Sequence, residues 1–123
     1  MSYTPNFGDI IIQKRMEQGL TLRGLAEKLE ISAPYLCDME KNRRQPPEKP
    51  LLDKLADILC MTESERNQMY DLAGECRGEV SSDLPEYIMT NEVVRVALRK
   101  AKVKNISEEE WLRFIQSMDH GES

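Results

Sequence analysis

Apolar residues recur at the spacing of an α-helix along most of this chain. The clearest stripe is formed by Leu22, Leu25, Ala26 and Leu29, and similar stripes lie before and after it. Because residues three and four apart lie on one face of a helix, this pattern predicts about five helices within residues 5–74.

Short polar signals mark where these helices are expected to begin and end. The expected N-terminal caps are Thr4 (with Pro5 at the first helical position), Thr21, Ser32 and Thr62. Thr62 also opens a capping box with Glu65. Gly19 and Gly74 are the expected ends of the first and fifth helices. Three prolines between residues 46 and 50 predict a loop after the third helix.

A stretch without periodicity, residues 75–83, separates these helices from the rest of the chain. It contains glycine, serine and charged residues, so we expect a linker there. About two further helices are expected after it, one capped by Asn91 and one opened by a Ser107–Glu110 capping box. The predicted fold is all-α, with a five-helix domain in residues 1–74, a linker in 75–83 and a short two-helix segment in 84–123.

The two-helix segment is too short to bury a large core by itself. Its apolar stripes therefore need the first domain, a second copy of the chain or another protein to pack against. The residues expected at such an oligomer or partner interface are Val94, Leu98, Trp111, Phe114, Ile115 and Met118.

Composition narrows the class of protein. The 123 residues carry a formal net charge of −5, with 32% charged and 6% aromatic residues. No apolar run reaches the roughly 18 residues of a membrane-spanning helix, so we expect a cytoplasmic chain with no membrane partner. The chain has three widely spaced cysteines and one histidine, and it has no catalytic motif. We therefore expect no metal, no cofactor and no enzyme activity.

The segment from Gly19 to Arg44 is the most informative about function. It predicts two short helices joined by a short turn and followed by a basic loop, which is the geometry that places one helix in a DNA major groove. The second helix exposes small or polar side chains at its start and one turn later, namely Ser32, Ala33, Pro34, Tyr35 and Asp38. Residues 12–44 hold seven Lys and Arg against five Asp and Glu, so this stretch is locally basic within an acidic chain.

The run GLTLRGLAEKLEISAPYLCDMEKNRRQPP resembles the helix-turn-helix of the lambda-type Cro and repressor (XRE) family. The resemblance implies a five-helix fold over residues 5–74 and a structural ion pair between Arg15 and Glu40. The residues that it places at base edges are Ser32, Ala33, Pro34, Tyr35 and Asp38. There the Asp38 carboxylate can accept from a cytosine amino group. The residues that it places at phosphates are Thr21, Arg23, Lys41, Asn42, Arg43 and Arg44.

Three positions depart from the family pattern. Glu30 stands at the turn where many members have glycine, which implies left-handed backbone strain or another turn shape. Gly24 replaces the usual glutamate of a capping box with Thr21, and Leu22 replaces a phosphate-binding glutamine. Arg23 is the expected substitute for that glutamine.

The resemblance predicts a sequence-specific DNA-binding transcription regulator, a repressor that binds a near-palindromic operator as a homodimer. One alternative is an antitoxin-like protein whose C-terminal helices bind a partner protein while the helix-turn-helix autoregulates its operon. Another is a helix-turn-helix scaffold without DNA affinity. Simpler interpretations also stay open for Asp38 as a surface acid, for Tyr35 as a packing residue, and for Arg43 and Arg44 as a solvated loop.

Overall fold

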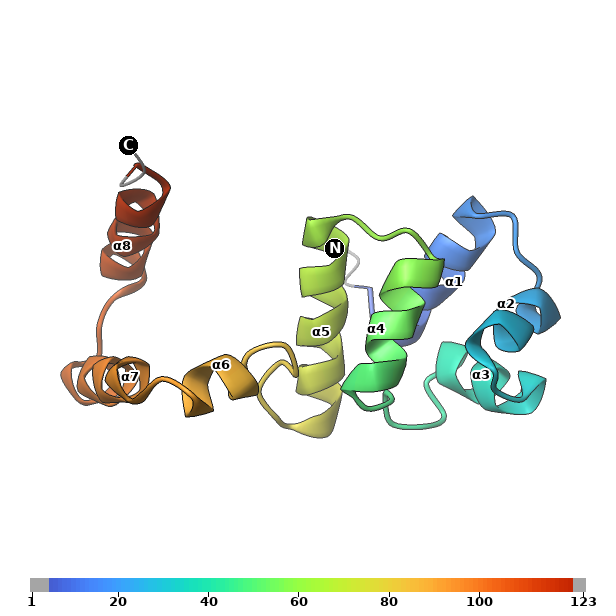
Figure 1. Ribbon diagram of the computed structural model, residues 1–123, viewed down its shortest axis with the longest axis horizontal. Helices are drawn as coiled ribbons and strands as arrows, with labels where there is room; N and C mark the ends of the chain where they lie inside the picture. The colour runs from blue at the N-terminus through green and yellow to red at the C-terminus, as the bar shows by residue number, and fades with distance from the viewer. Residues whose placement is uncertain (1–4, 121–123) are drawn as a thin grey trace. The chain divides into compact units, whose positions relative to one another are not determined.

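The computed structural model describes residues 5–120, and within them all regular structure is helical. The chain divides into two compact units, Met1–Pro85 and Glu86–Ser123. The helices of the first unit are α1 (Phe7–Glu17), α2 (Leu22–Leu29), α3 (Ala33–Glu40), α4 (Lys49–Ile58) and α5 (Glu63–Arg77). They are followed by α6 (Pro85–Met89), α7 (Glu92–Lys104) and α8 (Glu108–His120) (Figure 1). The predicted all-α fold is therefore confirmed.

Capping explains most helix starts in the first unit. The side-chain oxygens of Thr21, Ser32 and Thr62 accept from the backbone N–H of the residue three positions later, as predicted. The start of α1 was predicted wrongly. Asn6, not Thr4, is the cap, because Asn6 and Asp9 exchange reciprocal side-chain to backbone hydrogen bonds of 2.9 and 3.0 Å. Thr4 lies outside the described residues.

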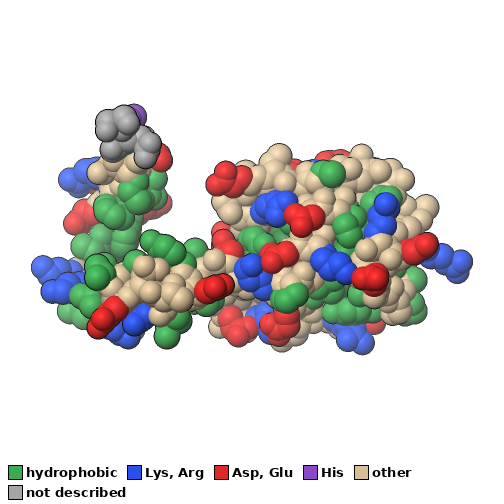
Figure 2. Space-filling view, viewed as in Figure 1, with side chains coloured by type: hydrophobic (Ala, Val, Ile, Leu, Met, Phe, Trp, Pro, Cys, Tyr) green, Lys and Arg blue, Asp and Glu red, His purple; other side chains and the backbone are tan. Residues whose placement is uncertain are grey.

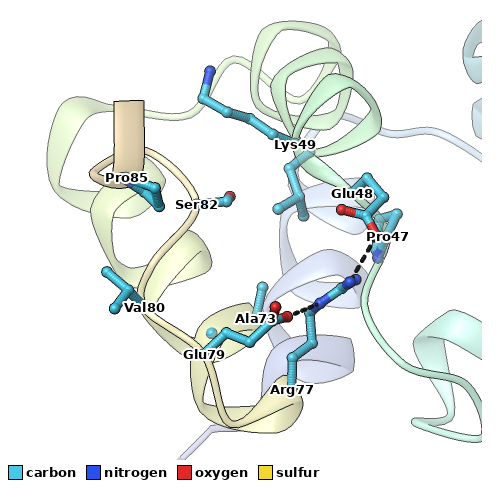
Figure 3. Close-up of a pocket in the computed structure, with 11 residues that line it drawn as sticks. Pro47, Glu48, Lys49, Ala73, Arg77, Glu79, Val80, Ser82 and Pro85 are labelled. Atoms are coloured by element: carbon cyan, nitrogen blue, oxygen red, sulfur yellow. Dashed lines mark hydrogen bonds and ion pairs between the residues drawn. The ribbon is translucent and has the colours of Figure 1, made fainter. Parts of the chain in front are cut away.

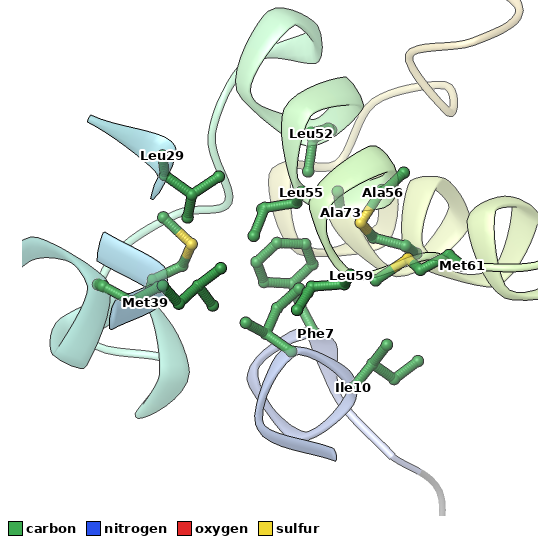
Figure 4. Close-up of a cluster of buried hydrophobic side chains, with 14 of the residues drawn as sticks. Phe7, Ile10, Leu29, Met39, Leu52, Leu55, Ala56, Leu59, Met61 and Ala73 are labelled. Atoms are coloured by element: carbon green, nitrogen blue, oxygen red, sulfur yellow. The ribbon is translucent and has the colours of Figure 1, made fainter. Parts of the chain in front are cut away.

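The core of the first unit is built from the apolar faces of all five helices. Figure 4 shows the Phe7 side chain among Leu29, Met39, Leu55 and Leu59. These side chains are almost completely buried. The core fixes α3 against the other helices, so the outer face of α3 is held rigidly in place.

The end of α5 differs from the prediction. The helix continues to Arg77 and ends at Gly78, which adopts the left-handed conformation of a C-terminal cap (φ 69°). Gly74 lies inside the helix, at a point where the following chain folds back onto it. A Cβ there would lie 2.8 Å from the Glu79 carbonyl oxygen, which explains the glycine. Residues 75–77 of the expected linker are therefore helical, and the short helix α6 near its end was not predicted.

The second unit has a different character. Helices α6, α7 and α8 contain no buried residue. The turn before α8 is closed by Ser107, whose Oγ accepts from the Glu110 N–H at 3.1 Å. Trp111 and Phe114 meet edge to face, with ring centroids 6.3 Å apart. Across residues 5–120, no helix combines the length and the apolar character required to span a membrane.

Candidate nucleic-acid interface

Helices α2 and α3 are joined by a tight turn at Glu30. This residue has φ 60° and ψ 41°, the left-handed conformation that glycine adopts most easily. The Ile31 N–H donates to the Ala26 carbonyl at 3.0 Å, which closes the end of α2. The turn thus keeps the left-handed shape although it lacks glycine.

A lysine from α4 supports this strained turn. Lys54 Nζ lies 3.1 Å from Glu30 Oε2 and 3.4 Å from the Leu29 carbonyl oxygen. The ammonium group therefore binds one of the free carbonyls at the α2 C-terminus as well as the side chain of the turn residue. The sequence pattern did not identify Lys54, because the contact joins residues 24 positions apart.

The predicted base-contacting residues lie together at the start and outer face of α3. Ser32 and Pro34 are exposed at its first turn, and Asp38 is half-buried one turn later. Ala33 and Tyr35 are also half-buried, and both pack partly against the core. The first turn therefore offers small groups and free space for the close approach of another surface.

Three of the predicted phosphate-contacting side chains, one on α2 and two just after α3, are unpaired within residues 5–120. Arg23, Lys41 and Arg43 are exposed, and none of them has a side-chain hydrogen bond or ion pair within the described part of the chain. The Thr21 Oγ accepts from the Gly24 N–H at 2.9 Å, which leaves its hydroxyl proton available to a phosphate.

Asn42 is committed to the fold instead. Its Oδ1 accepts from the Gly8 N–H at 3.0 Å, and its Nδ2 donates to Asn6 Oδ1 at 2.9 Å. Its backbone is left-handed, with φ 58°. These bonds tie the end of α3 to the start of α1, and they occupy the Asn42 amide oxygen and one of its two N–H donors.

Gly8 is a structural requirement that the sequence pattern did not reveal. A Cβ on this residue would lie 2.2 Å from the Glu40 carbonyl oxygen and 2.9 Å from Asn42 Nδ2. Only a residue without a side chain lets α1 approach the C-terminal end of α3 so closely.

Arg15 and Glu40 form the ion pair that the resemblance implies. Arg15 Nε donates to Glu40 Oε2 at 2.7 Å and Arg15 Nη2 donates to Oε1 at 3.2 Å, so the pairing is bidentate. Arg15 Nη1 also donates to the Leu20 carbonyl at 3.0 Å, just before α2. Glu40 is buried, and the pair therefore links α1, α3 and the segment that enters α2.

The Arg44 side chain reaches back to α3, although it remains exposed. Its Nε is 3.8 Å from Asp38 Oδ2, and its guanidinium carbon is 4.9 Å from the centre of the Tyr35 ring. Arg44, a predicted phosphate-contacting residue, therefore touches Asp38 and Tyr35, which are predicted to contact bases. The sequence pattern gave no sign of this arrangement.

Arg77, at the end of α5, holds the loop that follows α3. It donates to the Pro46 carbonyl at 2.9 Å, to Glu48 Oε1 at 2.6 Å and to Glu79 Oε1 at 2.7 Å. Figure 3 shows the contacts of Arg77 with Glu48 and Glu79 at the edge of a 210 Å³ cavity, toward which the side chain of Ser82 points. The Ser82 Oγ is buried and has no hydrogen-bond partner within residues 5–120. The cavity is smaller than the roughly 300–1,000 Å³ of most ligand pockets.

Two further polar networks stabilise the first unit. The buried Lys14 ammonium binds Glu17 at 2.9 Å and Glu65 at 3.0 Å, and these hydrogen bonds raise the pKa of Lys14. The Tyr70 hydroxyl donates to Asp53, and burial together with this carboxylate raises the pKa of Tyr70 to about 12. Within residues 5–120, no three His, Cys, Asp or Glu side chains are grouped as metal ligands would be.

The first five helices fall largely within a known domain family. The family model of the helix-turn-helix domain matches residues 8–69, just over half of the chain. No curated protein sequence matches. Among solved structures, a chain from the complex titled "SinR protein/SinI protein complex" is 23% identical, with 92% of this chain and 94% of that chain covered and a TM-score of 0.45.

Proposed function

This chain belongs to the helix-turn-helix domain family, and we propose that it is a repressor that binds a near-palindromic operator as a homodimer. The family match supports the broader function of a DNA-binding transcription regulator. The observation that carries the proposal is the exposed Ser32 and Pro34 at the start of α3, together with the cations Arg23 on α2 and Lys41 and Arg43 just after α3, which are exposed and unpaired within the described residues. Small groups permit a close approach to base edges, and the cations bind phosphates.

The proposed dimer forms through the second unit. Helix α7 and helix α8 contain no buried residue, although their faces are apolar (Figure 2). Leu98, Trp111, Phe114, Ile115 and Met118 are between 38% and 56% exposed, and Val94 is half-buried. Such a surface in a folded chain needs a partner.

Charge favours a second copy as that partner. Helix α7 carries five Lys and Arg against one Glu, whereas α8 carries four Asp and Glu against one Arg. In a symmetric pair, α7 of one copy can face α8 of the other, so opposite charges meet around the apolar centre. The proposed target is the DNA of a bacterium or a mobile element, so the proposed location is the cytoplasm.

Selection of bound duplexes from a random pool near 150 mM salt tests the DNA-binding proposal. We expect a near-palindrome whose half-sites lie about one helical turn, roughly 34 Å, apart. The variant Arg43→Ala should weaken all recovered sites about equally, because a phosphate contact does not depend on sequence. Lys28→Ala, which removes another exposed cation from α2, is the matched control. No enrichment, together with affinity that is independent of salt, would contradict the proposal.

The open apolar faces of α7 and α8 also favour an alternative, the antitoxin-like function. In that case the second unit binds a foreign protein rather than a second copy. Sedimentation equilibrium of the full chain separates the two functions. A dimer that dissociates after Trp111→Ala supports homodimeric repression, whereas a monomer at tens of micromolar favours the foreign partner.

A further inference from the structure

One side chain on the outer face of α3 opposes DNA binding. Asp38 is the only acid among the predicted base and phosphate contacts. A carboxylate placed in the major groove is repelled by the phosphates on either side of it. It is tolerated only where a hydrogen-bond donor compensates its charge.

In the free protein, Arg44 supplies that compensation. The distance from Arg44 Nε to Asp38 Oδ2 is 3.8 Å, and the guanidinium also rests on the Tyr35 ring. Lys41 and Arg43 have no such partner within the described residues. Of the three cations that follow α3, Arg44 is therefore the one that is paired, and its partner is Asp38.

The pair is able to exchange partners. The side chains of Arg44 and Asp38 are 58% and 38% exposed, so water screens their attraction. A new donor for the carboxylate can therefore take the place of Arg44 at small cost.

The base that faces Asp38 decides whether this exchange occurs. Cytosine presents the N4 amino donor and adenine the N6 amino donor in the major groove, whereas guanine and thymine present only acceptor atoms. Either amino group can replace Arg44 as the donor to the carboxylate, which leaves the guanidinium free to bind a phosphate. A base edge that offers only acceptors cannot replace Arg44, so Arg44 stays paired with Asp38 and does not bind a phosphate.

We propose that Asp38 and Arg44 form a base-dependent switch, in which Asp38 withholds Arg44 from the DNA backbone unless the facing base supplies an amino group. This inference rests on the proposed function, because it requires α3 to enter the major groove. It assigns Asp38 two effects: it selects cytosine or adenine over guanine and thymine at one position of each half-site, and it suppresses binding to DNA that lacks such a base there.

The test measures full-chain binding to a duplex recovered by selection and to a mixed-sequence duplex of equal length, from 50 to 200 mM NaCl. The slope of log K against log salt counts the phosphates that are bound. On the mixed duplex, Asp38→Asn should steepen this slope by about 0.9 per protomer and raise affinity at the low-salt end about threefold. On the selected duplex, Asp38→Asn should lose about tenfold of the discrimination against guanine or thymine at the position that faces Asp38.

A double variant separates the switch from simple charge repulsion. In an Arg44→Gln background, Asp38→Asn should no longer steepen the slope on the mixed duplex, because no arginine is left to release. The control is Glu63→Gln, which removes one exposed acid about 20 Å along α5 from Cys76, a neighbour of Arg43 and Arg44. It should leave both slopes unchanged.

If Asp38→Asn has the same effect with and without Arg44, or has no effect, the switch is overturned while DNA binding stands. If the wild-type chain binds neither duplex in a salt-dependent manner, the proposed function itself fails, and the switch fails with it.

Discussion

The two units of this chain have similar apolar patterns, but the first unit buries its apolar faces and the second leaves them exposed. In the first unit, the apolar faces of five helices meet in one core, and side chains such as Leu55 are fully buried. In the second unit, α7 and α8 carry equally regular stripes, yet Leu98 remains 40% exposed. Helical periodicity therefore shows which face of a helix is apolar, but it does not show whether the chain itself covers that face.

The largest expected effect comes from one substitution made in both units. Leu55→Ala removes a fully buried side chain and should lower the free energy of unfolding of the first unit by about 3–4 kcal/mol. Leu98→Ala should change the free energy of unfolding by less than about 0.5 kcal/mol. It should instead raise the dissociation constant of the proposed dimer. Urea denaturation followed by sedimentation checks both expectations. A large loss of unfolding free energy in Leu98→Ala would show that the second unit is packed as tightly as the first.

The next effect concerns the buried ion pair. Glu40→Gln keeps the shape of the side chain but leaves Arg15 without its bidentate partner, so it should cost about 3 kcal/mol in unfolding free energy. Glu30→Gln breaks an exposed pair with Lys54, in which Glu30 is 82% exposed, and should cost about 0.5 kcal/mol. Equal losses in the two variants, measured by guanidinium denaturation, would refute a special role for the buried pair.

A smaller loss is expected at the approach of α1 to α3. In Gly8→Ala the new Cβ would meet the Glu40 carbonyl oxygen at 2.2 Å, and relief of that clash should cost about 2 kcal/mol. In Gly24→Ala the Cβ meets only the Thr21 hydroxyl, at 3.0 Å, so the gain in helix propensity should roughly offset the contact. Thermal unfolding of the two alanine variants gives the comparison. A Gly8→Ala protein as stable as wild type would disprove the close approach.

The smallest effect depends on pH. A backbone hydrogen bond from Thr62 and the ammonium of Lys14 lower the pKa of Glu65 in the folded chain. Its stabilising contribution is therefore present above the unfolded-state pKa and is lost as the pH falls through the folded-state value. Glu65→Gln retains an acceptor for the Thr62 N–H but has no charge. The difference in Tm between wild type and this variant should stay constant from pH 7 down to the ordinary glutamate pKa of 4.5 and shrink as the pH falls further. A difference that stays constant below that pH would exclude the ionic contribution.

Features that depend on residues close together in the chain could be predicted from the sequence. Thr21, Ser32 and Thr62 were identified as caps because each bond spans three residues. The same local reasoning failed at Gly74, where glycine serves a close approach rather than a helix end.

Most contacts between residues far apart in the chain could not be predicted from the sequence pattern. The bonds from Lys54 to Glu30, from Arg77 to Glu48 and from Asn42 to Gly8 join residues 24 to 34 positions apart. No periodicity or capping signal records such pairs, because they exist only after the helices have packed. Arg15 with Glu40 was anticipated through the family resemblance, not through spacing.

The bond between Gly8 and Asn42 has a consequence for hydrogen exchange. The Gly8 amide lies in the first turn of α1, where no carbonyl of the same helix can accept from it. Its protection from solvent therefore depends on the Asn42 side chain at the far end of α3. Exchange at this single glycine reports how often the end of α3 separates from α1, including openings that leave the rest of the unit folded.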